Sequence, residues 1–223
     1  MKIKGYLHLL LALMAIVTCM TSCKETDDTV EEYPDWQKKN EAFFNAKYNA
    51  VRQYIANGDT SWKIIKSYAL QNSTIDQPTN YILVKVLREG TGSGCPLYTD
   101  TVRVHYRGQL LASTTHVDSK DSELGYVFEK SWATDTFDES ISIPSKMGVA
   151  NLTDGFSTAI QHMHIGDRWL VYIPHQLAYG SQDKTVIPAY STLVFDLTLA
   201  AYYRPGRLVP NWSANQFVFN EEE

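Results

Sequence analysis

The apolar residues of this chain are spaced as in a helix before residue 57 and as in strands after it. From Pro34 to Asn57 they recur at spacings of 3, 4, 7 and 8, which places most of them on one helical face. Pro34 suits the first turn of this helix, and Asn57-Gly58 suits its C-terminal end. We expect the face to pack on the domain that follows; an aromatic face of this kind also suits a homodimer or a client-binding surface.

Past Gly58 the pattern predicts strands. The clearest alternation lies in residues 101–111, where Val102, Val104 and Tyr106 share one face. The predicted strands are Trp62–Tyr68, Tyr81–Leu87, Thr101–Leu111, Trp169–Ile173 and Thr192–Leu199.

One short helix precedes the fourth of these strands. Its apolar face is formed by Phe156, Ala159, Ile160 and Met163. Thr153 or Asp154 suits its N-cap. These elements together predict an α+β fold, in which an antiparallel sheet wraps around one short helix and an N-terminal helix comes before it.

The first 22 residues resemble a bacterial lipoprotein signal peptide. Lys2 and Lys4 are followed by an apolar run, Leu7–Val17, which is shorter than the roughly 20 residues that span a bilayer. Small residues then precede Cys23, which would become the lipidated N-terminus. The alternative is an ordinary signal peptide in which Cys23 stays unmodified.

Residues 23–33 are acidic and contain little apolar surface to bury, so they are predicted to form a solvated tether. Lipoproteins carry more than one acyl chain, and two or more chains anchor a protein stably. We therefore expect an extracytoplasmic protein that is lipid-anchored to a bacterial membrane, on the periplasmic or the surface face of the outer membrane.

Composition narrows the classes of function. The formal net charge of -5 and the lack of a basic stripe argue against nucleic acid as a partner. Three cysteines without a Cys-x-x-Cys pair argue against a disulfide framework and structural zinc. His162 and His164 have no third ligand nearby, so we expect no metal, and no motif predicts a cofactor. The motifs of serine hydrolases, zinc proteases and P-loop enzymes are also missing.

The run Val104-His105-Tyr106-Arg107-Gly108 resembles the Val-His-Tyr-x-Gly strand of FKBP-type peptidyl-prolyl cis–trans isomerases. Further matches follow in family order, among them Arg88-Glu89-Gly90-Thr91-Gly92, Ile165-Gly166-Asp167-Arg168, Leu177-Ala178-Tyr179-Gly180 and Ser191-Thr192-Leu193-Val194-Phe195-Asp196. Residues 81–203 are thereby identified as an FKBP-type domain, preceded by a helical extension with the first strand (34–80) and followed by a tail (204–223).

The resemblance implies an apolar pocket for a proline ring. Its aromatic walls would be Tyr106, Phe128, Phe156, Tyr179 and Phe195, with Phe156 as the floor. Leu152, Thr153, Ile187 and Ile143 would complete the substrate-binding residues. The Thr153 N–H and the Tyr179 hydroxyl would each hold a substrate carbonyl. Without the resemblance, the strand and helix aromatics would be interpreted as ordinary core residues.

Several positions depart from the family pattern. Phe156 stands for the usual Trp, Thr153 for an aliphatic residue and Glu129 for Asp beside Phe128. Ile143 stands where many members have a further aromatic residue. Residues 112–127 are longer than the usual hairpin and would enlarge one rim of the pocket. These departures are compatible with reduced or redirected activity.

Three functions follow as hypotheses. The first is a prolyl isomerase that assists the folding of proline-containing polypeptide clients outside the cytoplasm. The second is an FKBP-like chaperone or scaffold lipoprotein, weakly active or inactive, that binds apolar segments of clients. The third, a surface lipoprotein that captures a nutrient, depends only on the tether and the 14 tyrosines. A homodimer through the helix at 34–57 is compatible with each.

Overall fold

The structure, a computed structural model, describes residues 30–212. The predicted signal peptide, Cys23, most of the acidic tether and the end of the C-terminal tail lie outside the described residues. The chain separates into two compact units, Met1–Glu31 and Glu32–Glu223, and the fold below is that of the second. Within the described range, no helix has both the length and the apolar character needed to cross a membrane.

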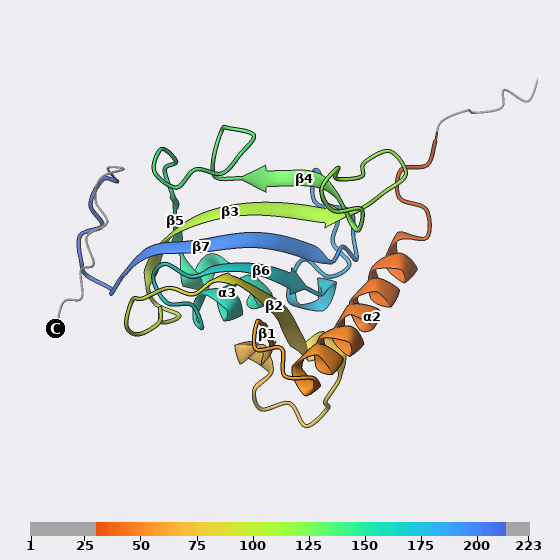
Figure 1. Ribbon diagram of the computed structural model, residues 1–223, viewed down its shortest axis with the longest axis horizontal. Coiled ribbons are helices and arrows are strands. Elements are labelled where there is room, and N and C mark those ends of the chain that lie inside the picture. Colours follow the sequence, from red (N-terminus) through yellow and green to blue (C-terminus); the bar gives the residue numbers. More distant parts are fainter. Residues whose placement is uncertain (1–29, 213–223) are drawn as a thin grey trace, which may run out of the picture. The chain divides into compact units, whose positions relative to one another are not determined.

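A seven-stranded antiparallel sheet forms the centre of this unit, with the strand order β1-β2-β6-β7-β3-β4 and with β5 paired to β3 (Figure 1). The strands are β1 Trp62–Lys66, β2 Tyr81–Arg88, β3 Thr101–Leu111, β4 Leu124–Lys130, β5 Ser145–Gly148, β6 Arg168–Ile173 and β7 Leu193–Tyr203. The predicted α+β fold is confirmed. The sequence did not predict β4 and β5; β5 has only four residues, and both are paired along the long strand β3, a partner that lies elsewhere in the sequence.

The short helix α3, Asp154–Ile160, packs against β1, β2 and β6 (Figure 1). All of its residues after Asp154 are buried. A Cβ atom at Gly155 would lie 2.3 Å from Cγ2 of Ile173, so a glycine is required for this close approach of helix and strand. Thr153 is the N-cap residue, but no side-chain hydrogen bond caps the helix.

Helix α2, Trp36–Ala56, packs on the domain through Trp36, Asn40, Phe44 and Val51. The packing expected from its periodicity is therefore confirmed, whereas the homodimer stays a prediction. The helix begins after Asp35, whose φ is 50°, so the placement of Pro34 in the first turn was wrong. The left-handed Asp35 turns the chain just before the helix starts.

Helix α2 also holds the segment that leads into β7. The Asn40 side chain accepts a hydrogen bond from the Thr192 N–H at 2.7 Å and donates one to the Trp36 carbonyl at 2.8 Å. The Trp36 indole N–H donates to the Ser191 hydroxyl at 2.8 Å. Because Asn40 is fully buried, these bonds are shielded from water.

The long connection between β3 and β4 binds Glu32, so the end of the predicted tether is attached to the domain and is not free in solvent. The Glu32 carboxylate accepts hydrogen bonds from the Ser113 hydroxyl and from the N–H and hydroxyl of Thr115. These bonds, with the Ser113 bond as the largest cause, keep the pKa of Glu32 well below its usual range. Lys39 of α2 donates to the Ala112 carbonyl at 2.6 Å. The connection between β3 and β4 thus attaches the N-terminal end of the second unit to the sheet.

Both faces of β3 are covered, because residues 131–144 lie over its second face. The ring of His105 is fully buried, and its centroid lies 5.0 Å from that of Phe137, which in turn contacts Trp132 at 4.6 Å. Neither nitrogen of His105 has a hydrogen-bond partner in the described part of the chain. Burial lowers the pKa of His105 to about 4, against a smaller opposing effect of the Glu139 charge.

The pKa of His105 predicts a loss of stability in acid. The unfolded chain binds a proton on this imidazole below about pH 6.5, whereas the folded chain does so only below about pH 4. Stability should therefore decline between these values by about 1.4 kcal/mol per pH unit from this group. Urea unfolding of the His105→Gln variant should show a flatter pH profile. Equal profiles for wild type, His105→Gln and the half-exposed control His164→Gln would contradict the prediction.

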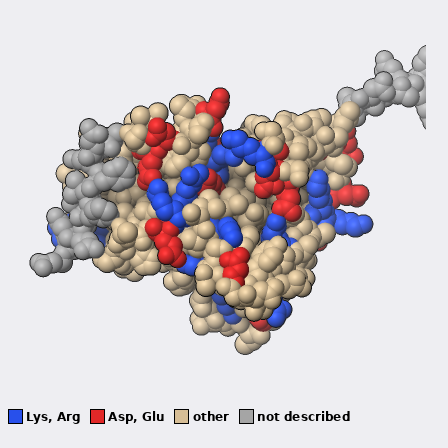
Figure 2. Space-filling view, viewed as in Figure 1, with Lys and Arg blue, Asp and Glu red and all other residues tan. Residues whose placement is uncertain are grey.

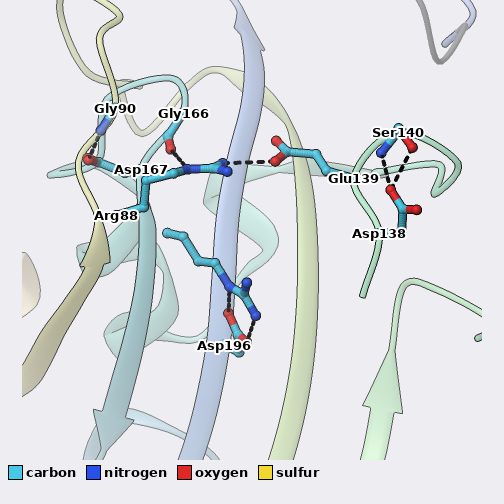
Figure 3. Close-up of polar contacts among 9 residues, drawn as sticks. Arg88, Gly90, Asp138, Glu139, Ser140, Gly166, Asp167 and Asp196 are labelled. Atoms are coloured by element: carbon cyan, nitrogen blue, oxygen red, sulfur yellow. Dashed lines mark hydrogen bonds and ion pairs between the residues drawn. The ribbon is translucent and has the colours of Figure 1, made fainter. Parts of the chain in front are cut away.

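Polar contacts join neighbouring strands and loops on the outer side of the sheet (Figure 3). The Arg168 guanidinium donates to both carboxylate oxygens of Asp196, at 2.9 and 2.6 Å. Arg88 donates to the Gly166 carbonyl and to Glu139, each at 2.9 Å, and so ties residues 131–144 to the sheet. On the face drawn in Figure 2, acidic and basic side chains are interspersed.

Candidate functional site

Four of the predicted site aromatics meet, although they come from four different elements. The Phe156 ring of α3 lies 4.9 Å from the Phe195 ring of β7 and 6.3 Å from the Tyr106 ring of β3. The Phe128 ring of β4 lies 5.6 Å from that of Phe195. All three pairs are edge-to-face, the arrangement that aromatic rings prefer. We call Tyr106, Phe128, Phe156 and Phe195 the ring cluster.

A glycine makes room for the ring cluster. Gly108 of β3 is paired with Phe195, and a Cβ atom there would lie 2.4 Å from Phe128 Cζ and 2.7 Å from Phe195 Cε1. Both rings therefore occupy the space of the missing side chain. This glycine stands inside a strand motif, and a glycine inside a strand is itself a signal of close approach.

Gly108→Ala should disturb the ring cluster. Because the new methyl group would overlap two rings, we expect the free energy of unfolding to fall by about 1–3 kcal/mol. The ring resonances of Phe128 and Phe195 should shift in NMR spectra. Gly148→Ala is the control, since its Cβ would come no closer than 3.1 Å to the Asn151 side chain. Equal effects of the two substitutions on stability and ring resonances would contradict the role given to Gly108.

Glu129 fixes the hydroxyl of Tyr106. That hydroxyl donates to Glu129 Oε1 at 2.6 Å, so the longer side chain still reaches its partner from the position where the family has Asp. Burial, followed by this hydrogen bond, raises the pKa of Tyr106 above its usual range. The Tyr106 N–H also donates to the Ser131 hydroxyl at 3.0 Å. The phenol at the edge of the ring cluster is thus held in one orientation.

Two hydrogen-bond donors beside the ring cluster have no partner. Neither the Thr153 N–H nor the Tyr179 hydroxyl forms a hydrogen bond among residues 30–212. Thr153 caps the helix that carries Phe156. Tyr179 is half-buried, and burial, with a further contribution from the Glu129 charge, raises its pKa. Both groups can therefore donate to carbonyl oxygens of a bound molecule.

The remaining predicted residues lie in different surroundings. Ile187 is buried in the core, and the partly buried Leu152 packs against the core. Ile143 is 66% exposed and forms no part of the core, so its predicted role in substrate binding stays a prediction. Phe128 and Glu129 line a hollow of about 590 Å³, with further walls from Arg107, Val127, Lys130, Trp132 and Asp135. In the described part of the chain, no three His, Cys, Asp or Glu side chains are grouped as metal ligands.

Comparison with known proteins gives consistent matches. A family model described as "FKBP-type peptidyl-prolyl cis-trans isomerase" matches residues 95–200. The chain is 31% identical to FK506-binding protein 1 of Debaryomyces hansenii over 117 residues, which are 52% of this chain and 89% of that protein. It is 34% identical to the FKBP-type 22 kDa peptidyl-prolyl cis-trans isomerase of Escherichia coli over 116 residues, 52% of this chain and 47% of that protein.

A third relative is similar over a somewhat longer stretch of this chain. The macrophage infectivity potentiator of Trypanosoma cruzi is 28% identical over 140 residues, 62% of this chain and 61% of that protein. The chain thus covers only 47% of the length of the Escherichia coli relative and 61% of the length of the Trypanosoma cruzi relative.

Proposed function

The chain belongs to the FKBP-type peptidyl-prolyl cis–trans isomerase family, and from this premise we propose that it catalyses cis–trans isomerisation of Xaa-Pro bonds in polypeptides. One observation carries the proposal: two unpaired donors, the Thr153 N–H and the Tyr179 hydroxyl, accompany a cluster of four edge-to-face rings. A cluster of aromatic rings with donors for carbonyls beside it suits a prolyl amide, although Tyr106, Phe156 and Phe195 are each only 5–6% exposed.

The chemistry requires neither a nucleophile nor a proton carrier. Rotation about a peptide bond costs about 18–20 kcal/mol because it breaks amide resonance. The twisted amide is less dipolar than the planar one, so an apolar surface disfavours the planar form more strongly. A 1,000-fold acceleration needs only about 4 kcal/mol of preferential binding of the twisted form.

Within this proposal, each group has a distinct task. The ring cluster receives the proline ring and excludes water from the rotating bond. The Thr153 N–H and the Tyr179 hydroxyl each hold a carbonyl of the peptide and keep it in place while the prolyl amide turns. Glu129 acts through Tyr106, whose hydroxyl it orients at 2.6 Å, and is a positioning residue.

We also propose that the enzyme acts on clients outside the cytoplasm, anchored through lipids on Cys23. The support is the basic, apolar and small-residue pattern that ends at this cysteine. In a bacterial host, wild-type protein should incorporate labelled palmitate and sediment with membranes, whereas Cys23→Ser should do neither. Labelling of both proteins would overturn the anchor and leave the isomerase proposal untouched.

The isomerase proposal is tested by following a short Xaa-Pro peptide with the full chain. We expect catalysis above the buffer rate, and a loss of at least about tenfold in kcat/KM for Tyr179→Phe, about 1.4 kcal/mol of transition-state stabilisation. The control is Tyr98→Phe, since Tyr98 is 57% exposed and takes part in none of the ring contacts of the ring cluster. Rates equal to buffer would overturn the proposal. If client aggregation were still suppressed, the chaperone function would replace it, in line with the exposed Ile141 and Ile143.

A further inference from the structure

A second cavity lies where helix α2 meets two short 3₁₀ helices, η2 (Pro78–Asn80) and η4 (His175–Leu177). Its volume is about 250 Å³. None of the ring-cluster residues lines it. Its walls include Glu41, Phe44, Asn45, Gln77, His175 and Gln176.

His175 is buried in this wall without a hydrogen bond. Only 8% of its surface is exposed, and neither ring nitrogen forms a hydrogen bond of normal geometry within residues 30–212, the nearest group being Glu41 Oε1 at 3.5 Å from Nε2. Burial lowers the pKa of His175, although the Glu41 charge acts in the opposite direction. A neutral imidazole has one donor and one acceptor nitrogen, so an acceptor is left unpaired unless a ligand supplies a proton donor. Leaving a buried polar group unpaired is costly, which points to a ligand or water at this place.

Glu41 supplies a negative charge beside the imidazole. Its Oε1 atom lies 3.5 Å from His175 Nε2 and accepts a hydrogen bond from the Gln37 side chain at 2.9 Å. Among the described residues, no lysine or arginine forms an ion pair with this carboxylate, and none lines the cavity. With His175 neutral, the cavity carries one uncompensated negative charge.

The other walls add acceptors and flat apolar surface. The side chains of Asn45, Gln77 and Gln176 form no hydrogen bonds among residues 30–212, so their amide oxygens are available. Phe44 and Pro174 line the cavity as a narrow apolar wall, since both are buried and Phe44 is 1% exposed. A ligand that offers several N–H donors, carries positive charge and has flat faces satisfies all of these groups. A guanidinium has five donors in one plane and no acceptor, whereas an ammonium is compact and lacks a flat face.

We infer that this cavity is a guanidinium-binding site, separate from the proposed isomerase site. The guanidinium would donate to the Glu41 carboxylate and the free nitrogen of His175, while its faces lie against the apolar wall. Its source is either an arginine side chain of a polypeptide or a free guanidinium compound. The cavity volume of about 250 Å³ lies just below the range of about 300–1,000 Å³ for ligand pockets, which suits one such group rather than a large molecule.

The test is NMR titration of the full, ¹⁵N-labelled chain with N-acetyl-arginine methylamide. We expect saturable shifts at the backbone amides of Asn45, Thr79 and Gln176. The citrulline analogue, which has the same shape without charge, should bind at least tenfold more weakly. Glu41→Gln should weaken arginine binding by a similar factor, because Glu41 is partly exposed and its neutral amide can be accommodated without loss of the fold. The exposed Glu89→Gln is the matched control and should bind as wild type does.

Agmatine, which has the guanidinium but no peptide group, separates the two sources. Tighter binding of the arginine derivative would indicate a polypeptide, and tighter binding of agmatine a free compound. Absence of saturable shifts, equal binding of arginine and citrulline analogues, or unchanged binding to Glu41→Gln would overturn the inference. Isomerisation of an Xaa-Pro peptide is measured independently, so failure of either proposal is distinguishable from failure of the other.

Discussion

Phe156→Leu is expected to lower kcat/KM for an Xaa-Pro peptide by about 100-fold, equal to about 2.7 kcal/mol of transition-state stabilisation. Phe156 contacts both Tyr106 and Phe195 edge-to-face, so its loss removes the centre of the ring cluster. Leucine keeps much of the volume, and we expect the free energy of unfolding to fall by only about 1 kcal/mol. Peptide isomerisation and urea unfolding measure the two effects separately.

Phe44→Leu is the matched control for this substitution. Phe44 is 1% exposed in the contact between α2 and the domain, so the same chemical change should cost similar stability. Its ring makes no contact with the ring cluster, and activity should stay within a few-fold of wild type. An equal loss of activity in both variants would show that the effect of Phe156→Leu comes from a general weakening of the fold.

Asn40→Ala is expected to lower the free energy of unfolding by about 2–4 kcal/mol. The substitution leaves the buried Thr192 N–H without its partner, which costs about 1–3 kcal/mol, and it removes the side-chain bond to the Trp36 carbonyl, which keeps its helical bond. Isomerase activity should fall as well, because the segment that leads into β7, and carries Tyr179 and Ile187, loses its attachment to α2. Urea unfolding and peptide isomerisation at one temperature test both expectations.

Asn49→Ala on the same helix is the control. Asn49 is exposed, and its side chain forms no hydrogen bond in the described range, so the substitution should change stability by less than about 0.5 kcal/mol. If Asn40→Ala unfolded at the same urea concentration as Asn49→Ala, the role of Asn40 as a buried link would be wrong.

Gly108 and His105 show which contacts could not be predicted from the sequence. The motif that contains His105 and Gly108 was identified, but the rings that fill the space at Gly108 come from β4 and β7. The burial of His105 depends on Phe137, in a connection that carries no periodic pattern. Neither relation can be obtained from spacing along one strand.

The order and period of apolar residues determined by themselves that this chain folds as a helix followed by an antiparallel sheet with one short helix, and the order of motifs determined the family. Local spacing suffices for this, because helices and strands repeat over a few residues. The tertiary structure alone decided which polar groups are paired and which are left over. Asn40 meets Thr192 across 152 positions of sequence, and that the donors of Thr153 and Tyr179 have no partner among residues 30–212 is visible only in the folded chain. Such contacts depend on how distant segments pack, which no local period encodes.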